Sequence, residues 1–343
     1  MMLAKRNAVA GMKLGVLLFA ISTTCAHGQT NLERPSIDEP TQVLSPVAAL
    51  DLTPQAMLLL NNAVADHNYI AAEQLLLKEI EHDSHSLRAA RLLAYLGSIY
   101  FLNHDYLNAA IAWKKSDALQ RLDTSLQFSL AMTYIHLGHS DWARVVLTTL
   151  ADQASNYALY PYWLGRLDYE AQHYSEAMVG FQKAIQLAPK MARAYDNLGL
   201  CYFAQNQNDL AILNYRKAID LEKDLPHPAA WPYLNLAVVL QSVNHLEESE
   251  RNAREAIRID PQLGQAHFRL GSLLEDRDRL EEAANEFNEA VRIDDSYAEP
   301  HLALARIYKR LGKEAAAQRE AQAYTHLHLE SKTDSLPNQP LKR

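Results

Sequence analysis

Apolar and small side chains recur along most of this chain with a period close to 34 residues. The pattern aligns on one leucine per period, and successive leucines are 37, 34, 34, 34, 38, 34 and 34 residues apart. These aligned residues are Leu59, Leu96, Leu130, Leu164, Leu198, Leu236, Leu270 and Leu304. Because a fixed period of roughly 20 to 50 residues is typical of stacked repeats, the pattern indicates a repeat architecture.

Each period holds two stretches of about a dozen residues with apolar positions at helical spacing. A tiny residue usually follows the aligned leucine, and a second small residue comes thirteen positions after the leucine. Small side chains let paired helices approach closely, while large ones fill the space beside them. One helix pair cannot bury its own apolar face, so we expect about eight pairs to stack around a shared core as an all-α solenoid.

The most regular period, Ala192–Leu225, resembles a tetratricopeptide repeat at nearly every signature position. The matching residues are Tyr195, Leu198, Gly199, Tyr202, Ala211, Tyr215 and Ala218, with Lys223 where proline is usual. The first and last units depart most, with Leu60 in place of glycine and Tyr324 in place of alanine, as capping repeats often do. The resemblance implies a right-handed superhelix whose concave wall is lined by the first helix of each unit.

The resemblance extends over about residues 53–331. Its eight units lie near residues 53–86, 90–123, 124–157, 158–191, 192–225, 230–263, 264–297 and 298–331. The longest interval contains an inserted segment, Pro226–Ala229. We favour a one-turn helix extension with a tolerated loop over a kink that divides the array into two arms, because loop insertions are thermodynamically cheap.

Both ends of the chain differ from the repeat region. Residues 1–28 have a basic start and then the short apolar run LGVLLFAI, which predicts a secretory signal peptide cleaved after Ala26 or Gly28. The alternative is an uncleaved cytosolic N-terminus. Residues 29–52 contain three prolines and predict a flexible linker, and residues 332–343 predict a disordered polar tail.

The charge of the chain narrows the choice of partners. The net charge is −8, and loss of three basic residues with the signal peptide would make it −11. Nucleic acids need a cationic surface, so we expect no nucleic-acid partner. After the leader, no segment is long and apolar enough to predict a transmembrane helix. Because residues 1–28 predict a signal peptide, we expect a periplasmic or extracellular protein, with lipid anchoring at Cys25 as the alternative.

The concave wall would carry an aromatic set in the N-terminal half of the array. If the resemblance holds, the residues facing the wall lie two before, one before and two after each aligned leucine, with others one helical turn further on. They include Tyr95, Phe128, Met132, Tyr162, Trp163, Arg166 and Tyr169. Exposed Tyr, Trp and Arg are typical interface anchors, so we expect this set to bind a partner. The alternative is that several of the rings pack against the neighbouring unit.

The C-terminal half would carry a polar set on the same wall. Its members are Arg193, Asn197, Asn235, Arg269 and Arg306. Such a ladder can hydrogen-bond to an extended peptide backbone and pair with a carboxylate. It is similar to the carboxylate clamp of some family members, but Asp196 stands where those clamps place a lysine, which argues against the clamp itself. The alternative for the arginines is a solvated helix face.

Motifs that would indicate catalysis are missing from the sequence. There is no HExxH, no phosphate-binding glycine loop, no GxSxG and no CxxCH. The closely spaced histidine pairs have no third or fourth ligand nearby in the pattern, so we expect no metal site and no cofactor. We predict a non-enzymatic scaffold that holds a peptide segment or partner subunit. The alternative is a structural or assembly factor of an envelope complex that acts through its convex face or ends, and lipid anchoring at Cys25 would favour it.

Overall fold

The computed structural model describes residue 44 and residues 47–81 and 84–334, and these residues form one 3₁₀ helix and sixteen α-helices without a strand. After the short helix η1 (Val47–Leu50), the α-helices form eight consecutive pairs. The pairs are α2 (Pro54–Ala65) with α3 (Tyr69–Glu81), α4 (Leu87–Leu102) with α5 (Tyr106–Leu119), α6 (Thr124–His136) with α7 (Ser140–Gln153), α8 (Leu159–Glu170) with α9 (Tyr174–Leu187), α10 (Ala192–Ala204) with α11 (Asn208–Glu222), α12 (Trp231–Ser242) with α13 (Leu246–Ile259), α14 (Gly264–Asp276) with α15 (Leu280–Ile293), and α16 (Ala298–Arg310) with α17 (Glu314–Asp334).

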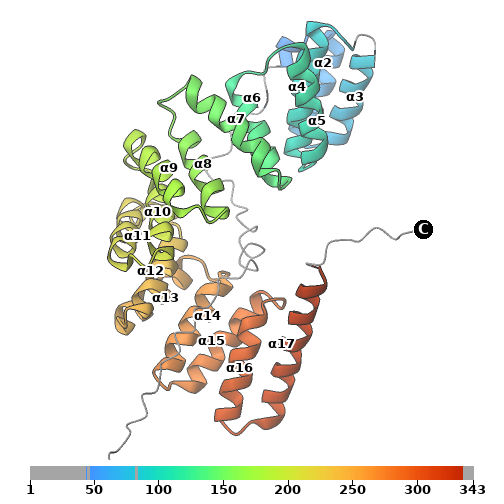
Figure 1. Ribbon diagram of the computed structural model, residues 1–343. Coiled ribbons are helices and arrows are strands. Elements are labelled where there is room, and N and C mark those ends of the chain that lie inside the picture. Colours follow the sequence, from blue (N-terminus) through green and yellow to red (C-terminus); the bar gives the residue numbers. More distant parts are fainter. Residues whose placement is uncertain (1–43, 45–46, 82–83, 335–343) are drawn as a thin grey trace, which may run out of the picture. The chain divides into compact units, whose positions relative to one another are not determined.

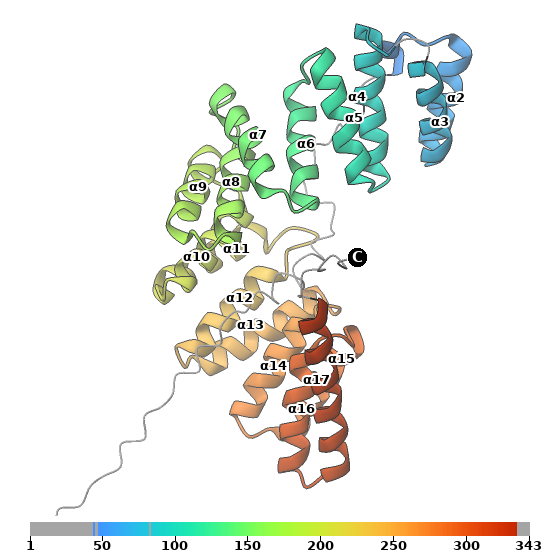
Figure 2. The ribbon, with the colours of Figure 1, turned by 45° about the vertical axis from the view of Figure 1, so that its right-hand side comes forward.

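The pairs stack in chain order, and each helix packs mainly on the helices before and after it (Figures 1 and 2). From α8 onward, each first helix also touches the first helix of the next pair. The clusters of buried side chains combine residues of successive pairs, as in the cluster that links Trp113 of α5 with Leu130 of α6 and Leu147 of α7. These contacts confirm the predicted all-α solenoid of eight helix pairs.

The tiny residue after the aligned leucine makes room for a ring on the paired helix. A Cβ atom added to Gly97 would lie 2.5 Å from Trp113, and one added to Gly199 would lie 2.6 Å from Tyr215. Gly271 has the same relation to Phe287, at 2.7 Å. The large apolar position of the sequence pattern therefore fills the space above the glycine of its own pair.

Every turn between the two helices of a pair contains one residue in the left-handed region. These residues have φ between 54° and 74° and stand at the same position of all eight pairs: His67, His104, Gly138, Gln172, Asn206, Asn244, Asp278 and Gly312. The next residue donates its backbone N–H to a carbonyl near the end of the first helix, as Asn68 does to Ala63 at 2.8 Å. This is the hydrogen bond of a helix that ends in a left-handed residue, and it reverses the chain within a few residues.

Several boundaries differ from the expected ones. Helix α4 begins at Leu87, three residues before the predicted unit start, because Ser86 caps it through its hydroxyl. Residues 47–52, predicted as the end of a linker, pack on the first pairs, and Leu50 is 1% exposed. Helix α17 ends at Asp334, inside the predicted tail. The predicted signal peptide and residues 29–43 of the linker lie outside the described residues.

The inserted segment Pro226–Ala229 leaves the core continuous. Helix α11 ends at Glu222, whose carboxylate accepts the backbone N–H of Ala229 at 3.1 Å. Beyond the loop, Leu236 and Leu240 of α12 pack with Tyr215 of α11 in one buried cluster. The insertion is therefore a loop between two packed pairs, but the expected one-turn helix extension is not seen, since α11 has 15 residues against 14 in α9 and α13.

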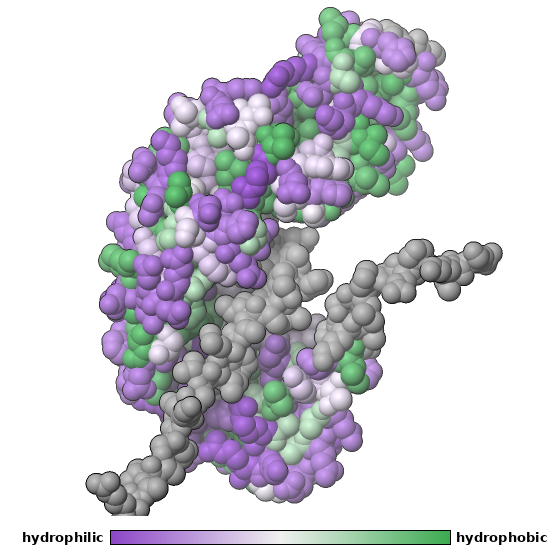
Figure 3. Space-filling model, viewed as in Figure 1, coloured by the Kyte–Doolittle hydropathy of each residue, from purple (hydrophilic) through white to green (hydrophobic). Residues whose placement is uncertain are grey.

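Among the residues described, no helix is long and apolar enough to span a lipid bilayer. On the face shown in Figure 3, hydrophilic and hydrophobic residues are mixed, and the green patches are separated by purple ones. The apolar residues of the solenoid are thus mainly the ones that join neighbouring helices.

Candidate functional site

The structure buries several of the residues predicted to line an exposed wall. Tyr95, Phe128, Met132 and Tyr162 are each no more than 5% exposed. The expected exposed aromatic wall is therefore wrong at these four positions. The reason is that each lies in a seam between successive pairs: the ring of Phe128 on α6 is 5.7 Å from that of Tyr160 on α8, and Tyr162 on α8 packs in one buried cluster with Leu198 of α10.

The remaining predicted residues are distributed along the first helices. Asn197 is buried, and Arg306 is exposed. The half-buried ones are Trp163, Arg166, Tyr169, Arg193, Asn235 and Arg269. Tyr95 lies in α4, and Phe128 and Met132 lie in α6, so these three belong to core clusters apart from the polar residues further along the chain.

Seven side chains of α8, α10 and α12 meet in what we name the α8–α12 polar cluster. Its members are Tyr162, Trp163, Arg166, Arg193, Asp196, Asn197 and Asn235. The amide nitrogen of Asn197 donates to the hydroxyl of Tyr162 at 3.4 Å and to the carbonyl of Arg193 at 2.8 Å. The guanidinium of Arg193 lies over the ring of Tyr162, 4.8 Å from its centre. Three consecutive first helices are thus joined through polar side chains.

Asp196 is the carboxylate of this cluster. Its Oδ1 accepts a hydrogen bond from the amide of Asn235 at 3.0 Å. Burial raises the pKa of Asp196 to about 6, although this hydrogen bond and the charge of Arg166 act in the opposite direction. Burial also lowers the pKa of Arg193 to about 10. The cluster therefore combines two guanidinium groups with a carboxyl group that changes charge near neutral pH.

Two N–H groups of the cluster are buried without an acceptor. Within the described part of the chain, the indole Nε1 of Trp163 and the Nε of Arg166 have no hydrogen-bond partner. The two side chains are neighbours, because the guanidinium of Arg166 lies 5.8 Å from the centre of the Trp163 ring. A buried donor without an acceptor costs about 1–3 kcal/mol, so this position favours a ligand that supplies an oxygen.

The arginines nearer the C-terminus have internal partners instead. Arg269 of α14 donates to the side-chain oxygen of Gln241 on α12 at 2.8 Å. Arg306 of α16 holds Glu275 of α14 through two hydrogen bonds of 2.7 and 2.6 Å. Neither residue reaches the α8–α12 polar cluster through a hydrogen bond among the described residues. Arg306 thus ties two pairs together rather than forming the expected ladder with Asn235.

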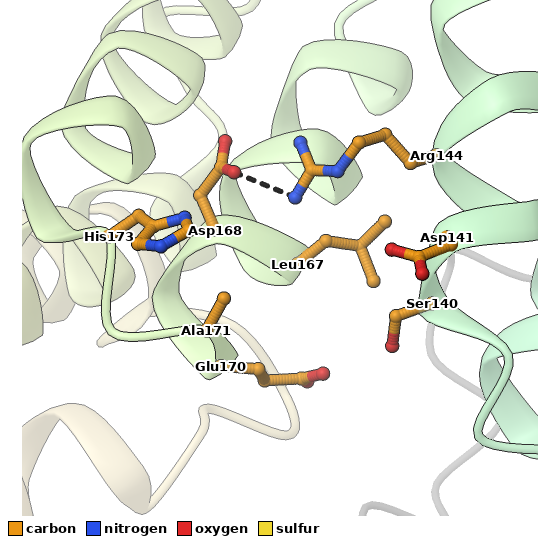
Figure 4. A pocket seen from close by; sticks show the side chains of 8 residues that line it. All are labelled: Ser140, Asp141, Arg144, Leu167, Asp168, Glu170, Ala171 and His173. Atoms are coloured by element: carbon orange, nitrogen blue, oxygen red, sulfur yellow. Dashed lines mark ion pairs between the residues drawn. The ribbon is translucent and has the colours of Figure 1, made fainter.

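A polar pocket of about 440 Å³ lies between α7 and the end of α8 (Figure 4). It is lined by Ser140, Asp141, Arg144, Leu167, Asp168, Glu170, Ala171 and His173. Arg144 reaches across it to Asp168 at 2.7 Å. Among the residues described here, no hydrogen bond joins Ser140 to His173, so the pocket contains no paired nucleophile and base.

Metal ligation and thiol chemistry have little basis in the described residues. They include no group of three or more His, Cys, Asp or Glu side chains that could hold a metal ion. Burial raises the pKa of the Cys201 thiol to about 12, so this buried thiol stays protonated at neutral pH. The closely spaced histidine pairs are His82/His85, His136/His139 and His326/His328, and His82 lies outside the described residues.

Two residues of the first-helix face were not among the predicted site residues. Asp196 had been noted only as a departure from the carboxylate clamp, yet it joins α10 to α12. Gln241 links α12 to α14 through Arg269 and also donates to Asp276 at 2.6 Å. The repeat register contains a signal for Gln241, since it stands five residues after its aligned leucine, the same position as the predicted Tyr169.

Family models for the tetratricopeptide repeat match residues 190–262 and 234–298. Superkiller complex protein 3 of Mus musculus is 24% identical over 207 residues, which are 55% of this chain and 13% of that protein. The STIP1 homolog of Dictyostelium discoideum is 29% identical over 99 residues, which are 28% of this chain and 16% of that protein. The chain therefore spans well under a fifth of the length of either relative.

Three solved structures have a similar fold. A tetratricopeptide repeat protein from Parabacteroides merdae has a TM-score of 0.60 at 16% identity, covering 74% of this chain and 97% of that one. A chain of the APC/C hetero-tetramer Cut9–Hcn1 has a TM-score of 0.57 at 16% identity, covering 74% of this chain and 46% of that one. PilW, a type IV pilus biogenesis factor, has 0.53 at 19% identity, covering 58% and 91%. At such identities the likeness shows the fold alone.

The repeat register, the glycine-to-ring contacts and the family-model matches agree with one another. All eight helix pairs have a residue in the left-handed region at the same turn position, and the matched residues 190–298 cover the most regular of these pairs. Taken together, these findings show that the chain belongs to the tetratricopeptide repeat family.

Proposed function

We propose that this chain is a non-enzymatic scaffold that holds a peptide segment or partner subunit against its first helices, at the α8–α12 polar cluster. The observation that carries the proposal is the pair of buried donors without an acceptor, Trp163 Nε1 and Arg166 Nε. A peptide carbonyl or carboxylate placed between them would accept from both. Tetratricopeptide repeat proteins generally act as protein-interaction scaffolds, which agrees with this assignment.

The electrostatics of the cluster favour an acidic or carboxylate-bearing segment. Arg166, which also pairs with Glu170 at 3.4 Å, and Arg193 bring two positive charges to this face, and Asp196 has a pKa of about 6. Uptake of a proton by Asp196 would remove the negative charge that opposes an anionic ligand. We therefore expect binding to strengthen as the pH falls from about 7 to 5.5.

The binding test uses the full chain and a display library of random peptides. Peptides enriched on the wild type are labelled, and their affinities are measured by fluorescence anisotropy for wild type, Trp163→Phe and Arg166→Lys. Each change removes one of the two N–H groups while keeping a ring or a charge, so affinity should fall about tenfold. Trp142→Phe is the matched control, since Trp142 is an exposed indole on the second helix α7.

Two results would contradict the proposal. One is that no peptide is enriched on the folded wild type. The other is that enriched peptides bind Trp163→Phe, Arg166→Lys and Trp142→Phe with equal affinity, which would move binding away from the cluster. Circular dichroism of each variant confirms that a loss of affinity is not a loss of helix.

The site of action belongs to the same proposal. We infer that the scaffold is exported, because residues 1–28 have the pattern of a secretory signal peptide. A fusion of these residues to alkaline phosphatase, which folds only outside the reducing cytoplasm, should be active in a bacterial host. An inactive fusion would place the protein in the cytoplasm. Incorporation of radiolabelled lipid that depends on Cys25 would instead support a lipoprotein.

The alternative function is an assembly factor that acts through its second helices. One observation favours it: exposed apolar side chains occur on the second helices α5, α7, α9 and α11, away from the α8–α12 polar cluster. The two functions use different sides of each helix pair and can coexist.

A further inference from the structure

Four exposed apolar side chains stand at the same position of four consecutive second helices. They are Ile111 of α5, Val145 of α7, Val179 of α9 and Leu213 of α11, and each follows the one before by 34 residues. They are 44%, 67%, 67% and 63% exposed, respectively. Equivalent positions of stacked repeats lie along one line, so these residues form one second-helix apolar row.

The row ends after α11, because polar residues occupy the same position in the later second helices. The same position holds Arg251 in α13, Asn285 in α15 and Arg319 in α17, and all three are exposed. The repeat fold therefore does not itself require an apolar side chain here. Because solvent-exposed Val, Leu and Ile gain nothing from this position in the monomer, the row points to a surface that is covered in an assembly.

Neighbouring side chains widen the row. Leu107, Trp142 and Leu210 stand one helical turn before Ile111, Val145 and Leu213, and are 60%, 55% and 40% exposed. Together the seven side chains expose several hundred Å² of apolar surface. This approaches the area of about 800 Å² that one partner contributes to a standard protein interface.

Charges flank the row in a fixed order on α9 and α11. Glu176 precedes Val179 by one turn and Lys183 follows it by one turn, and Asp209 and Lys217 flank Leu213 in the same way. In the part of the chain that the structure describes, none of these four charges has an ion-pair partner. Each helix thus presents acid, apolar and basic groups in succession, all of them open to a partner.

We propose that the second-helix apolar row is the interface of a homodimer, with the second helices of the two copies antiparallel and the two-fold axis along the row. Reversing one copy brings Val179 against the partner's Val179. The same reversal places Lys183 opposite the partner's Glu176, and Lys217 opposite the partner's Asp209. The acidic groups lie on one side of the row and the basic groups on the other, so the surface is complementary to itself only in this orientation.

A second copy fits this surface better than an anionic or a cationic partner. A surface of one sign, such as an anionic bilayer, would attract Lys183 and Lys217 but repel Glu176 and Asp209. The proposed dimer neutralises both kinds of charge and covers the apolar row at the same time. It extends the proposed function, because it leaves the first helices open for a ligand.

The first test is sedimentation equilibrium of the full chain over a wide range of concentration. The wild type should be a reversible dimer, and Val145→Ser with Val179→Ser should raise its dissociation constant on the order of tenfold or more. Leu302→Ser is the matched control, because Leu302 is exposed on the first helix α16 and lies outside the row. A monomer at all concentrations, or a dimer unchanged by the double substitution, would overturn the proposal.

The second test reads the orientation directly. A two-fold axis along the row predicts that Val179→Cys forms a disulfide with its own counterpart under mild oxidation. The background carries Cys25→Ser, which leaves the buried Cys201 as the other thiol. Leu302→Cys, on the first helix α16 and outside the row, should remain uncross-linked. Equal cross-linking of both variants would rule out the specific pairing.

A charge exchange completes the test. Lys183→Glu should weaken the dimer, because the new carboxylate faces the partner's Glu176. Adding Glu176→Lys to the same chain should restore it, because each new lysine then faces a new glutamate. Failure of the second substitution to rescue association would exclude the antiparallel arrangement. Loss of the dimer would leave peptide binding at Trp163 intact, so the two proposals fail independently.

Discussion

At the scale of single residues, the unusual group is the carboxyl of Asp196. It is 9% exposed, and burial raises its pKa to about 6, well above the value near 3.8 of an unfolded chain. A raised carboxyl pKa means that the folded state holds this proton more tightly than the unfolded state. The folded state therefore loses stability as the pH rises from about 4 through 6, by about 3 kcal/mol when the carboxyl is fully ionised.

The variant Asp196→Asn tests this pH dependence. The amide oxygen can still accept from Asn235, but it never ionises, so the variant should be more stable than the wild type by up to about 3 kcal/mol near pH 7.5. The gain should shrink as the pH falls to about 4.5. Urea unfolding followed by circular dichroism measures both. A gain that is independent of pH, or one equalled by Asp152→Asn at an exposed position of α7, would contradict the assignment.

At the scale of helices, pairing depends on how closely the two members of a pair approach. Gly97, Gly165, Gly199 and Gly271 each face a ring of the second helix, with so little space that a methyl group would meet it. The last two pairs add a polar link at one shared position. His267 faces Glu286 with 2.8 Å between Nδ1 and Oε2, and His301 faces Glu320 at 2.7 Å. The hydrogen bond to Glu286 raises the pKa of His267 and so favours its charged form.

Substitution of the packing glycine tests the helix contact. Gly199→Ala places a Cβ 2.6 Å from the ring of Tyr215, so it should destabilise the protein by about 1–3 kcal/mol. Gly264→Ala is the matched control within a helix. The nearest atom to its Cβ would be 3.5 Å away, and the change should be neutral or stabilise by up to about 1 kcal/mol. Urea unfolding compares the two, and equal effects would show that close packing at Gly199 is not what holds the pair.

At the scale of the whole molecule, ion pairs join successive pairs in the C-terminal half. The carboxylate of Glu250 on α13 is 5% exposed and is held by Arg254, Arg277 and Arg279. Burial alone would raise the pKa of Glu250, but these arginines outweigh it and lower the pKa. Arg310 of α16 similarly binds Asp278 at 2.6 Å. In the N-terminal half, aromatic and aliphatic contacts hold the corresponding seams together with the ion pairs Arg88–Glu79 and Arg144–Asp168.

Loss of the Glu250 charge should therefore weaken the stack locally. Glu250→Gln removes the buried carboxylate that Arg277 and Arg279 share and leaves them only the exposed Glu247 and Glu282, so we expect a loss of about 2 kcal/mol. In a repeat protein each pair contacts only its neighbours, so amide hydrogen exchange should increase in α13 to α15 and remain unchanged in α4 to α7. Glu289→Gln, which breaks an exposed pair with Arg292, should have little effect. A uniform increase along the chain would contradict local coupling.

The ion pairs of Glu250 stabilise the folded state only while its carboxyl group is ionised, so their contribution is lost at low pH. Because the folded pKa of Glu250 lies below its unfolded value, its contribution is complete above about pH 4.5 and is lost as the pH falls through the folded pKa. This dependence is opposite in sign to that of Asp196. The two carboxyl groups differ because Glu250 is surrounded by arginines, whereas Asp196 is buried with a neutral amide as its hydrogen-bond donor.

The sequence by itself determined the helix pairs, their number and the contact of glycine with a ring. Each of these follows from spacing within one period, where positions three and four apart must share a helix face. It did not determine which residues of the first helices stay exposed. Tyr95, Phe128 and Tyr162 occupy positions expected on an open wall, yet they lie in seams between pairs. Their burial depends on how one pair is rotated against the next, and no local pattern encodes that rotation.

Charge pairing was likewise decided by tertiary structure. Arg306 was predicted to join a ligand-binding ladder, but it binds Glu275, 31 residues earlier in the chain. Asp196 was a mismatch to a familiar motif, but it accepts a bond from Asn235, 39 residues later. Such partners meet only when successive pairs stack, because the distance between them in sequence spans a whole repeat. Periodic spacing therefore determines the helices and their pairing, while the packing of one repeat on the next determines the burial and charge of the surface.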